Sequence, residues 1–172
     1  MKALPAIGAL SCLLGSVPVG PAVAAEPAAR CTFDYHPRIH PGLSLTPSSG
    51  TIDSDQATGV ATCTGSIDGK TITGPGTFGF AGSYGDPVPA SCQSGGVGKG
   101  AVIISFPTEG GTVALKDPAT YQFGPGSGYP PGIGDWTGSR TVGSYLVLPD
   151  QGDCVTTPVT QARGRGRFTI TG

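Results

Sequence analysis

The sequence predicts an all-β protein: an antiparallel β-sandwich or small β-barrel of about eight short strands with two disulfides. Three observations support this fold class. Short segments rich in Thr, Val, Ile and aromatic residues alternate with turns that contain Gly, Pro and Asp. No segment after residue 25 repeats apolar residues at helical spacing over several turns. Four cysteines remain when the N-terminal segment is set aside, which suits a small disulfide-bonded β-core.

The expected strands follow one another along the chain between turn signals. Residues 101–106 form the most apolar run and are predicted to be a central strand buried on both faces. Asp68-Gly69 predicts a tight hairpin, because this pair readily supplies two residues with positive φ. The Gly/Pro-rich residues 124–134 predict an exposed mobile loop. The expected strands are residues 31–35, 59–64, 70–80, 101–106, 112–115, 120–123, 141–148 and 167–171.

The N-terminus has the pattern of a secretory signal peptide. Lys2 precedes a mostly apolar stretch that ends in the small residues 22–25. We expect cleavage after Ala25, with cleavage after Ala24 as the near alternative, so that residues 1–25 are the signal peptide and residues 26–172 a single secreted β-domain. A buried N-terminal helix is disfavoured by three prolines in this segment. The expected location is extracellular or associated with the cell envelope.

Cysteine usage agrees with export. Cys12 lies in the signal peptide, and an even number of cysteines in the exported part implies two disulfides. Three pairings are compatible with the four residues. We favour the pairing in which each of the two disulfides closes a contiguous half of the chain. A zinc site is disfavoured because no Cys-x-x-Cys pair occurs. The favoured pairs are Cys31–Cys63 and Cys92–Cys154.

Composition excludes several functional classes. Only 12% of the residues are charged and the net charge is −1, which argues against a nucleic-acid binder. No apolar run approaches the ~18 residues of a membrane span, so no transmembrane segment is expected. The glycine motif at residues 74–79 matches a nucleotide-binding fingerprint only formally, because no helix follows it. We therefore expect no cofactor and no metal.

Enzymatic signals are weak. Neither a Gly-x-Ser-x-Gly nor a His-Glu-x-x-His motif occurs. His36 and His40 each precede a proline, which predicts a stiff extended loop; a base or metal site there is the less favoured alternative to a plain surface loop. Acidic pairs at 53 and 55 and at 150 and 153 are interpreted as turn-capping residues, in preference to a pair of glycosidase carboxylates or a calcium site.

One charge pattern suggests binding. Arg163, Arg165 and Arg167 alternate with glycines, so an extended strand would present all three on one face. A row of guanidinium groups binds phosphate, sulfate or carboxylate. The favoured alternative is a solvated edge strand whose charges prevent edge-to-edge aggregation. Tyr129, within the Gly/Pro-rich segment, is a second candidate contact residue.

The chain also resembles a group of known proteins. The export signal, short Gly/Thr/Ala-rich strands, the absence of Asn and two expected disulfides are similar to small secreted β-proteins of actinobacteria. The stretches TCTGSIDGKTITGPGTFGFAGSYGD and YLVLPDQGDCVTTPVT carry this resemblance. It implies a secreted two-disulfide all-β protein and supplies no catalytic residue.

These observations lead to three functional hypotheses. The first is a secreted, non-enzymatic β-module that binds at the cell envelope or outside the cell, with an anionic envelope polymer or another secreted protein as its partner. The second is a secreted inhibitor or small-ligand carrier. The third is a hydrolase with an unrecognised site. A pocket lined by apolar side chains would favour the carrier, and a histidine bonded to a serine and an aspartate would favour the hydrolase.

Overall fold

The structure is a computed structural model that describes residues 27–54, 59–125 and 132–172. Every helix or strand assigned in these ranges is a β-strand, and all strand pairs are antiparallel, which confirms the all-β fold class. The strands are β1 (Ala29–Tyr35), β2 (Pro37–Leu43), β3 (Gly50–Ser54), β4 (Val60–Ile67), β5 (Lys70–Thr71), β6 (Gly76–Tyr84), β7 (Gly96–Thr108), β8 (Gly111–Pro125), β9 (Gly132–Gly138), β10 (Thr141–Gln151) and β11 (Val159–Ile170).

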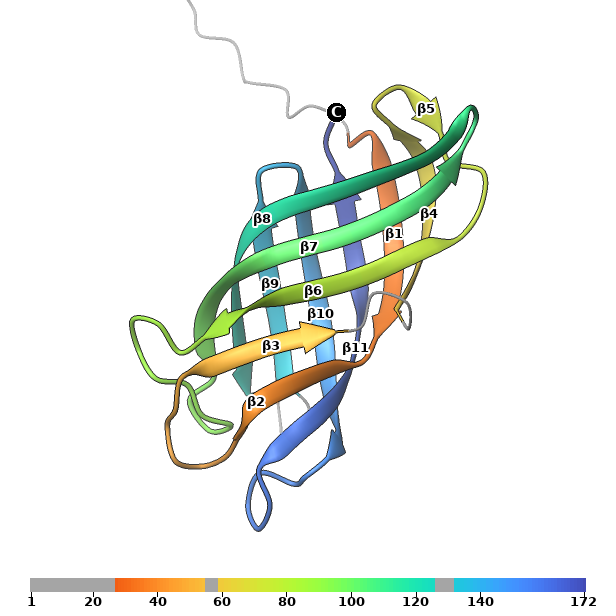
Figure 1. The fold of residues 1–172 in the computed structure, drawn as a ribbon. Coiled ribbons are helices and arrows are strands. Elements are labelled where there is room, and N and C mark those ends of the chain that lie inside the picture. The colour runs from red at the N-terminus through yellow and green to blue at the C-terminus, as the bar shows by residue number, and fades with distance from the viewer. Residues whose placement is uncertain (1–26, 55–58, 126–131) are drawn as a thin grey trace, which may run out of the picture.

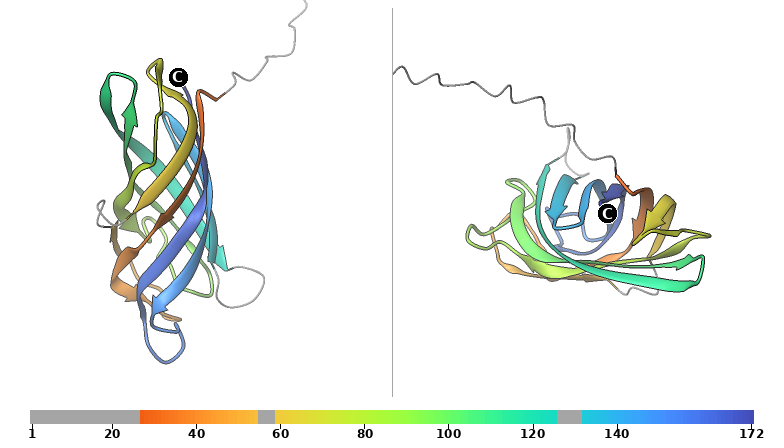
Figure 2. Two further views of the ribbon diagram at one scale, coloured as in Figure 1. Left: turned by 90° about the vertical axis from the view of Figure 1, so that its right-hand side faces the viewer. Right: turned by 90° about the horizontal axis from the view of Figure 1, so that it is seen from above.

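The strands pair into a closed, barrel-like ring (Figure 1, Figure 2). β1 and β2 share the neighbour β11, while β3 and β4 share the neighbour β6. From β6 to β10 the strands pair in chain order, and β10 closes the ring onto β11. With β1–β2 and β3–β4 each counted as one position and the short β5 left aside, the eleven strands occupy eight positions.

The ring has two distinct ends. At the terminal end, which carries the label C in Figure 1, β1 begins and β11 finishes. At the far end, β2 finishes and β11 begins, so Leu43 pairs with Val159. The loops after β6 and β10 also lie at the far end, because Tyr84 pairs with Gly50 and β10 and β11 are antiparallel neighbours.

Side chains alternate between the interior of the ring and its outer surface along most strands. On β11, Phe168 is buried and Arg165 is exposed. β7 follows the same rule: Val102 is buried, whereas Ile103 is half-buried. The prediction that residues 101–106 are buried on both faces is therefore wrong. In a ring of this kind, only the inner face of a strand is packed against the core.

Inward-facing glycines make room for aromatic rings on the neighbouring strand. A Cβ atom at Gly164 would overlap the ring of Tyr35, and one at Gly143 would overlap the indole of Trp136. The absence of a side chain thus permits close packing of a large ring. Abundant glycine serves the core as well as the turns. Directly opposed pairs are Phe33–Gly166, Tyr35–Gly164, Gly98–Tyr121, Gly134–Tyr145 and Trp136–Gly143.

A buried polar network closes the terminal end. The carboxylate of Asp117 on β8 accepts hydrogen bonds from the backbone amides of Ser139, Arg140 and Thr141, the last at 2.7 Å, and from the hydroxyls of Ser139 and Thr141. Thr141 Oγ1 in turn accepts from the indole Nε1 of Trp136 at 3.1 Å. Burial raises the pKa of Asp117, but these hydrogen bonds outweigh it and leave the pKa below its usual range. The ionised carboxylate ties the β9–β10 hairpin to β8.

The disulfides join the predicted pairs, Cys31–Cys63 and Cys92–Cys154. Cys31 and Cys63 face each other directly on β1 and β4, towards the terminal end. Cys92 and Cys154 lie in the loops after β6 and β10, at the far end. Each end of the ring therefore has its own crosslink.

The structure confirms one predicted hairpin and shows that two predicted loops belong partly to strands. Asp68 and Gly69 have φ angles of 51° and 73° and connect β4 to β5, as the sequence predicts. Residues 36–41, predicted to be a loop, belong largely to β2, which pairs with β3. The predicted loop 124–134 starts inside β8 and finishes inside β9, and its residues 126–131 lie outside the described ranges. The extended backbone before proline was predicted correctly, but its strand pairing was not.

Candidate functional site

An apolar cavity lies inside the ring. It provides about 110 Å³ of space and extends from the middle of the interior towards the far end, where Leu43 and the Cys92–Cys154 disulfide contribute to its wall. An eight-stranded ring is just wide enough to be filled by side chains or to hold one small ligand. Eight aromatic residues dominate the lining: Phe33, Tyr35, Phe78, Phe80, Tyr121, Phe123, Trp136 and Tyr145.

The cavity arises from the strand pattern. Phe33 and Tyr35 are alternate inward residues of β1, and Tyr121 and Phe123 are alternate inward residues of β8. The rings of Phe33 and Phe78 stack with their centroids 4.2 Å apart, which forms the inner wall at mid-height. Close packing continues from there to the terminal end, while space remains towards the far end.

Four lining side chains carry a nitrogen or oxygen atom, and three of them have hydrogen-bond partners. Tyr121 donates its hydroxyl to the carbonyl of Ser83 at 2.9 Å, and Tyr145 donates to the carbonyl of Gln122 at 3.0 Å. Trp136 donates to Thr141, as described above. The hydroxyl of Tyr35 has no hydrogen-bond partner in the described part of the chain.

Tyr35 lines the cavity, and its hydroxyl has no hydrogen-bond partner among the described residues. Tyr35 is only 7% exposed, yet no fully buried side-chain oxygen or nitrogen in the described residues lacks a partner. A hydroxyl without a partner in the described residues keeps some accessible surface, and the cavity is the space that the Tyr35 side chain lines. Tyr35 also contributes to raising the pKa values of Tyr121 and Tyr145, which line the same cavity. Burial raises the pKa of Tyr35 itself, so its hydroxyl stays protonated and acts as a donor.

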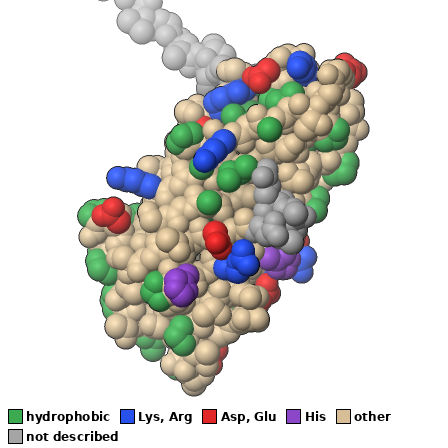
Figure 3. Space-filling model, in the orientation of Figure 1, with side chains coloured by type: hydrophobic (Ala, Val, Ile, Leu, Met, Phe, Trp, Pro, Cys, Tyr) green, Lys and Arg blue, Asp and Glu red, His purple; other side chains and the backbone are tan. Residues whose placement is uncertain are grey.

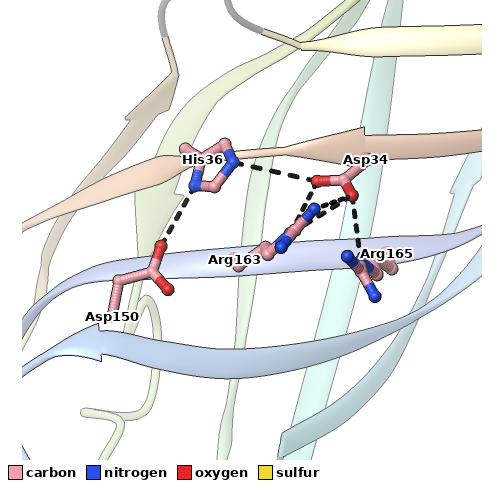
Figure 4. A network of polar contacts seen from close by, with 5 residues as sticks. All are labelled: Asp34, His36, Asp150, Arg163 and Arg165. Atoms are coloured by element: carbon pink, nitrogen blue, oxygen red, sulfur yellow. Dashed lines mark hydrogen bonds and ion pairs between the residues drawn. The ribbon is translucent and has the colours of Figure 1, made fainter.

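The predicted arginine row lies on the outer face of β11, and Figure 4 shows two of its members, Arg163 and Arg165, beside Asp34. Two of its members bind one carboxylate: Arg163 reaches both oxygens of Asp34, at 2.6 to 3.2 Å, and Arg165 reaches Oδ2 at 2.9 Å. Hydrogen bonds from Arg163 are the largest cause of a lowered pKa at Asp34. Arg167 is exposed. β11 pairs on both sides, so the interpretation of this segment as an edge strand is wrong.

The two histidines lie on β2 and just before it. His36 places Nδ1 3.0 Å from Asp150 and Nε2 3.8 Å from Asp34 (Figure 4). No hydrogen bond joins the side chain of His36 or His40 to a serine in the described ranges. Ser, His and Asp therefore do not form a catalytic triad around either histidine in this part of the structure.

The acidic residues singled out in the sequence mostly have structural partners. Asp153 accepts hydrogen bonds from the amides of residues 155–157, which confirms its turn-capping role. Asp53 pairs with Arg38 at 3.3 Å, while Asp55 lies outside the described residues. Within the described ranges, no group of three or more His, Cys, Asp or Glu residues is arranged to hold a metal ion. Charged side chains are scattered over the face shown in Figure 3.

Two predictions fall on residues that the structure does not describe. These are the signal peptide, residues 1–25, and the candidate contact residue Tyr129. Over the described ranges, no helix has the length and apolar character needed to cross a membrane. Comparison with protein-family models, with curated proteins and with solved structures found no match to this chain.

Sequence reasoning missed Tyr35 and the cavity. In the sequence, Tyr35 is only the last residue of the expected strand 31–35, because the lack of a hydrogen-bond partner is a property of the assembled ring. One signal was present in the sequence: Gly164 and Gly166 alternate with arginine and leave the inner face of β11 bare. Such a pattern indicates that a ring or ligand packs against the glycines, and the rings of Tyr35 and Phe33 do so.

Proposed function

We propose that this protein is a secreted, non-enzymatic binding protein whose ligand is a small apolar molecule held inside the ring of strands. The observation that carries the proposal is the cavity, with its predominantly aromatic and aliphatic lining. Protein interiors are normally packed as densely as organic crystals, and voids larger than a water molecule are few. An apolar space of this size therefore supports binding of a small apolar molecule.

The free energy of the empty cavity supports this proposal. A cavity costs about 24 cal/mol per Å³, so a space of about 110 Å³ destabilises the protein by about 2–3 kcal/mol. That is a large part of a typical net stability of about 5–15 kcal/mol. A ligand that fills the space recovers much of this loss. A cavity of about 150 Å³ engineered into another protein binds benzene, so a molecule with one ring is the appropriate size.

Export is part of the proposal and rests on the N-terminal pattern. The two disulfides agree with it, because disulfides persist mainly in oxidising compartments such as the extracellular space. A protein that carries an apolar molecule through water outside a cell needs a stable shell around its site. The closed ring and its two crosslinks provide such a shell.

Trp136 offers a direct test, because it is the one tryptophan in the chain and it lines the cavity. We expect toluene to change the fluorescence of Trp136 saturably and to raise the melting temperature. Val147→Phe, on the inner face of β10, should abolish both effects by filling the space. Val142→Phe on the outer face of the same strand is the matched control and should leave them unchanged. No saturable response of the folded wild type would refute the proposal.

Anion binding at the outer arginines is a second proposal. It is favoured by the placement of Arg163, Arg165 and Arg167 on one outer face, although Asp34 already binds two of them. If they bind an anionic envelope polymer, a heparin column should retain the protein at low salt, and salt should release it by screening over about 10 Å. Passage of the folded protein through the column without delay at low salt would rule this out.

A further inference from the structure

We propose that the ligand is neutral and carries a hydrogen-bond acceptor, and that the hydroxyl of Tyr35 donates to this acceptor inside the cavity. This inference rests on the proposed function and specifies the chemical class of ligand. The observation behind it concerns Tyr35, which lines the apolar cavity and is only 7% exposed. Its hydroxyl has no hydrogen-bond partner in the described residues.

A nearly buried hydroxyl without a hydrogen-bond partner, such as that of Tyr35, is unusual in a native protein. Buried polar groups in native proteins are nearly always hydrogen-bonded, because a donor removed from water without a partner destabilises the fold. Tyr121 and Tyr145 obey this rule by donating to backbone carbonyls in the wall of the ring. Of the three described tyrosines that line the cavity, only Tyr35 has no acceptor among the described residues, which leaves its donor for a molecule that enters the cavity. A small number of such polar groups in an apolar pocket is the usual way to orient a ligand.

The charge of the ligand follows from the rest of the lining. Among the described residues that line the cavity, none is Lys, Arg, His, Asp or Glu. A charged ligand would lose its hydration there without gaining a counter-ion, which is strongly unfavourable. Tyr35 stays protonated because burial raises its pKa. The site therefore suits a neutral molecule with one ring and one acceptor, such as a cyclic ketone.

Two probes of the same shape separate this inference from the proposed function. Cyclohexanone carries a carbonyl oxygen, and methylenecyclohexane has a CH₂ group in its place. Calorimetric titration of the full folded protein would measure both affinities in the wild type, in Tyr35→Phe and in Tyr145→Phe. Tyr145→Phe is the matched control, because Tyr145 lines the same cavity but donates to Gln122.

We expect Tyr35→Phe to lower the affinity for cyclohexanone by between about 2-fold and 12-fold, the range of a typical net hydrogen bond, and to leave methylenecyclohexane binding unchanged. Tyr145→Phe should affect both probes alike. Without a ligand, Tyr35→Phe should melt no lower than the wild type, since no bond is lost. Tyr145→Phe should melt about 2–4 °C lower, since it loses a bond to the backbone.

Two results would overturn the inference. If Tyr35→Phe leaves the ratio of the two affinities unchanged while both probes bind, Tyr35 does not donate to the ligand, and the proposed function survives. If Tyr35→Phe melts well below the wild type without a ligand, its hydroxyl has a structural partner and is not held free for a ligand. Failure of the wild type to bind either probe or toluene would refute both the inference and the proposed function.

Discussion

At the terminal end of the ring, Asp117 accepts hydrogen bonds from three consecutive backbone amides and two hydroxyls. Towards the far end, the hydroxyl of Tyr35 has no hydrogen-bond partner among the residues that the structure describes. Both groups are more than nine-tenths buried. The core is closely packed around Asp117 and hollow beside Tyr35. A buried polar group whose bonds are all made within the protein holds the fold together, while one without a partner marks the place where another molecule is expected.

Removal of a disulfide should cause the largest loss in the free energy of unfolding at either end of the ring. Loop-closure entropy predicts losses of roughly 3.7 kcal/mol for Cys31→Ala/Cys63→Ala and roughly 4.3 kcal/mol for Cys92→Ala/Cys154→Ala, from sequence separations of 32 and 62 residues. Urea unfolding measures these losses. The two variants should differ in binding: only the far-end variant should also lose affinity for toluene, because Cys92 and Cys154 line the cavity. Equal affinity in both variants would show that the cavity does not depend on its own crosslink.

Removal of the Asp117 carboxylate at the terminal end should lower the free energy of unfolding by nearly as much as removal of a disulfide. Asp117→Ala leaves the amides of Arg140 and Thr141 and a buried hydroxyl without their acceptor, and each such group costs about 1–3 kcal/mol. We expect a total loss of about 3 kcal/mol or more in urea unfolding. Tyr35→Phe is the control from the other end and should cost nothing. Similar losses in the two variants would remove the contrast between the ends.

The stability of the protein should also depend on pH in acid through the carboxylate of Asp117. The pKa of Asp117 is lowered in the folded protein, so the unfolded chain, with a pKa of about 3.9, binds the proton more readily. The stabilisation is therefore complete well above about pH 4 and is lost as the pH falls through the folded pKa. Asp34 acts in the same direction. Melting curves as a function of pH should fall steeply in acid for the wild type and less steeply for Asp117→Asn.

Close packing of glycine against aromatic rings gives a smaller effect. Gly164→Ala would overlap the ring of Tyr35, and forced overpacking costs about 1–3 kcal/mol. Gly124→Ala is the control, because a Cβ there meets no atom within 4 Å. We expect the control to change the free energy of unfolding by less than about 1 kcal/mol. If both substitutions are equally tolerated, the inward glycines are not required by the rings.

The comparison also shows what could be predicted from the sequence. The hairpin at Asp68-Gly69, the outward row of arginines and the β-structure of the eight predicted segments follow from local patterns of period two and from turn chemistry, and the structure confirms them. The sequence did not predict β2, β3 and β9, and the segments 112–115 and 120–123 belong to one strand, β8. The disulfide pairs were favoured because each closes a contiguous half of the chain, and this is also confirmed.

Properties of the closed ring could not be predicted in this way. Asp34 binds Arg163 across 129 residues, and Asp117 reaches Thr141 across 24, so neither partner is visible in a local pattern. The role of β11 as a strand paired on both sides depends on ring closure by β10. That Tyr35 has no hydrogen-bond partner among the described residues depends on every residue that surrounds its hydroxyl, so no local pattern predicts it.

A crystal structure of the protein grown with cyclohexanone would test the central claim most directly. We expect electron density for the ring of the ligand on the far-end side of the stacked Phe33 and Phe78, with its carbonyl oxygen about 2.7–2.8 Å from the hydroxyl of Tyr35. The packed terminal end around Asp117 should be unchanged. An empty cavity at a ligand concentration that saturates the fluorescence of Trp136, or a ligand whose oxygen points away from Tyr35, would contradict it.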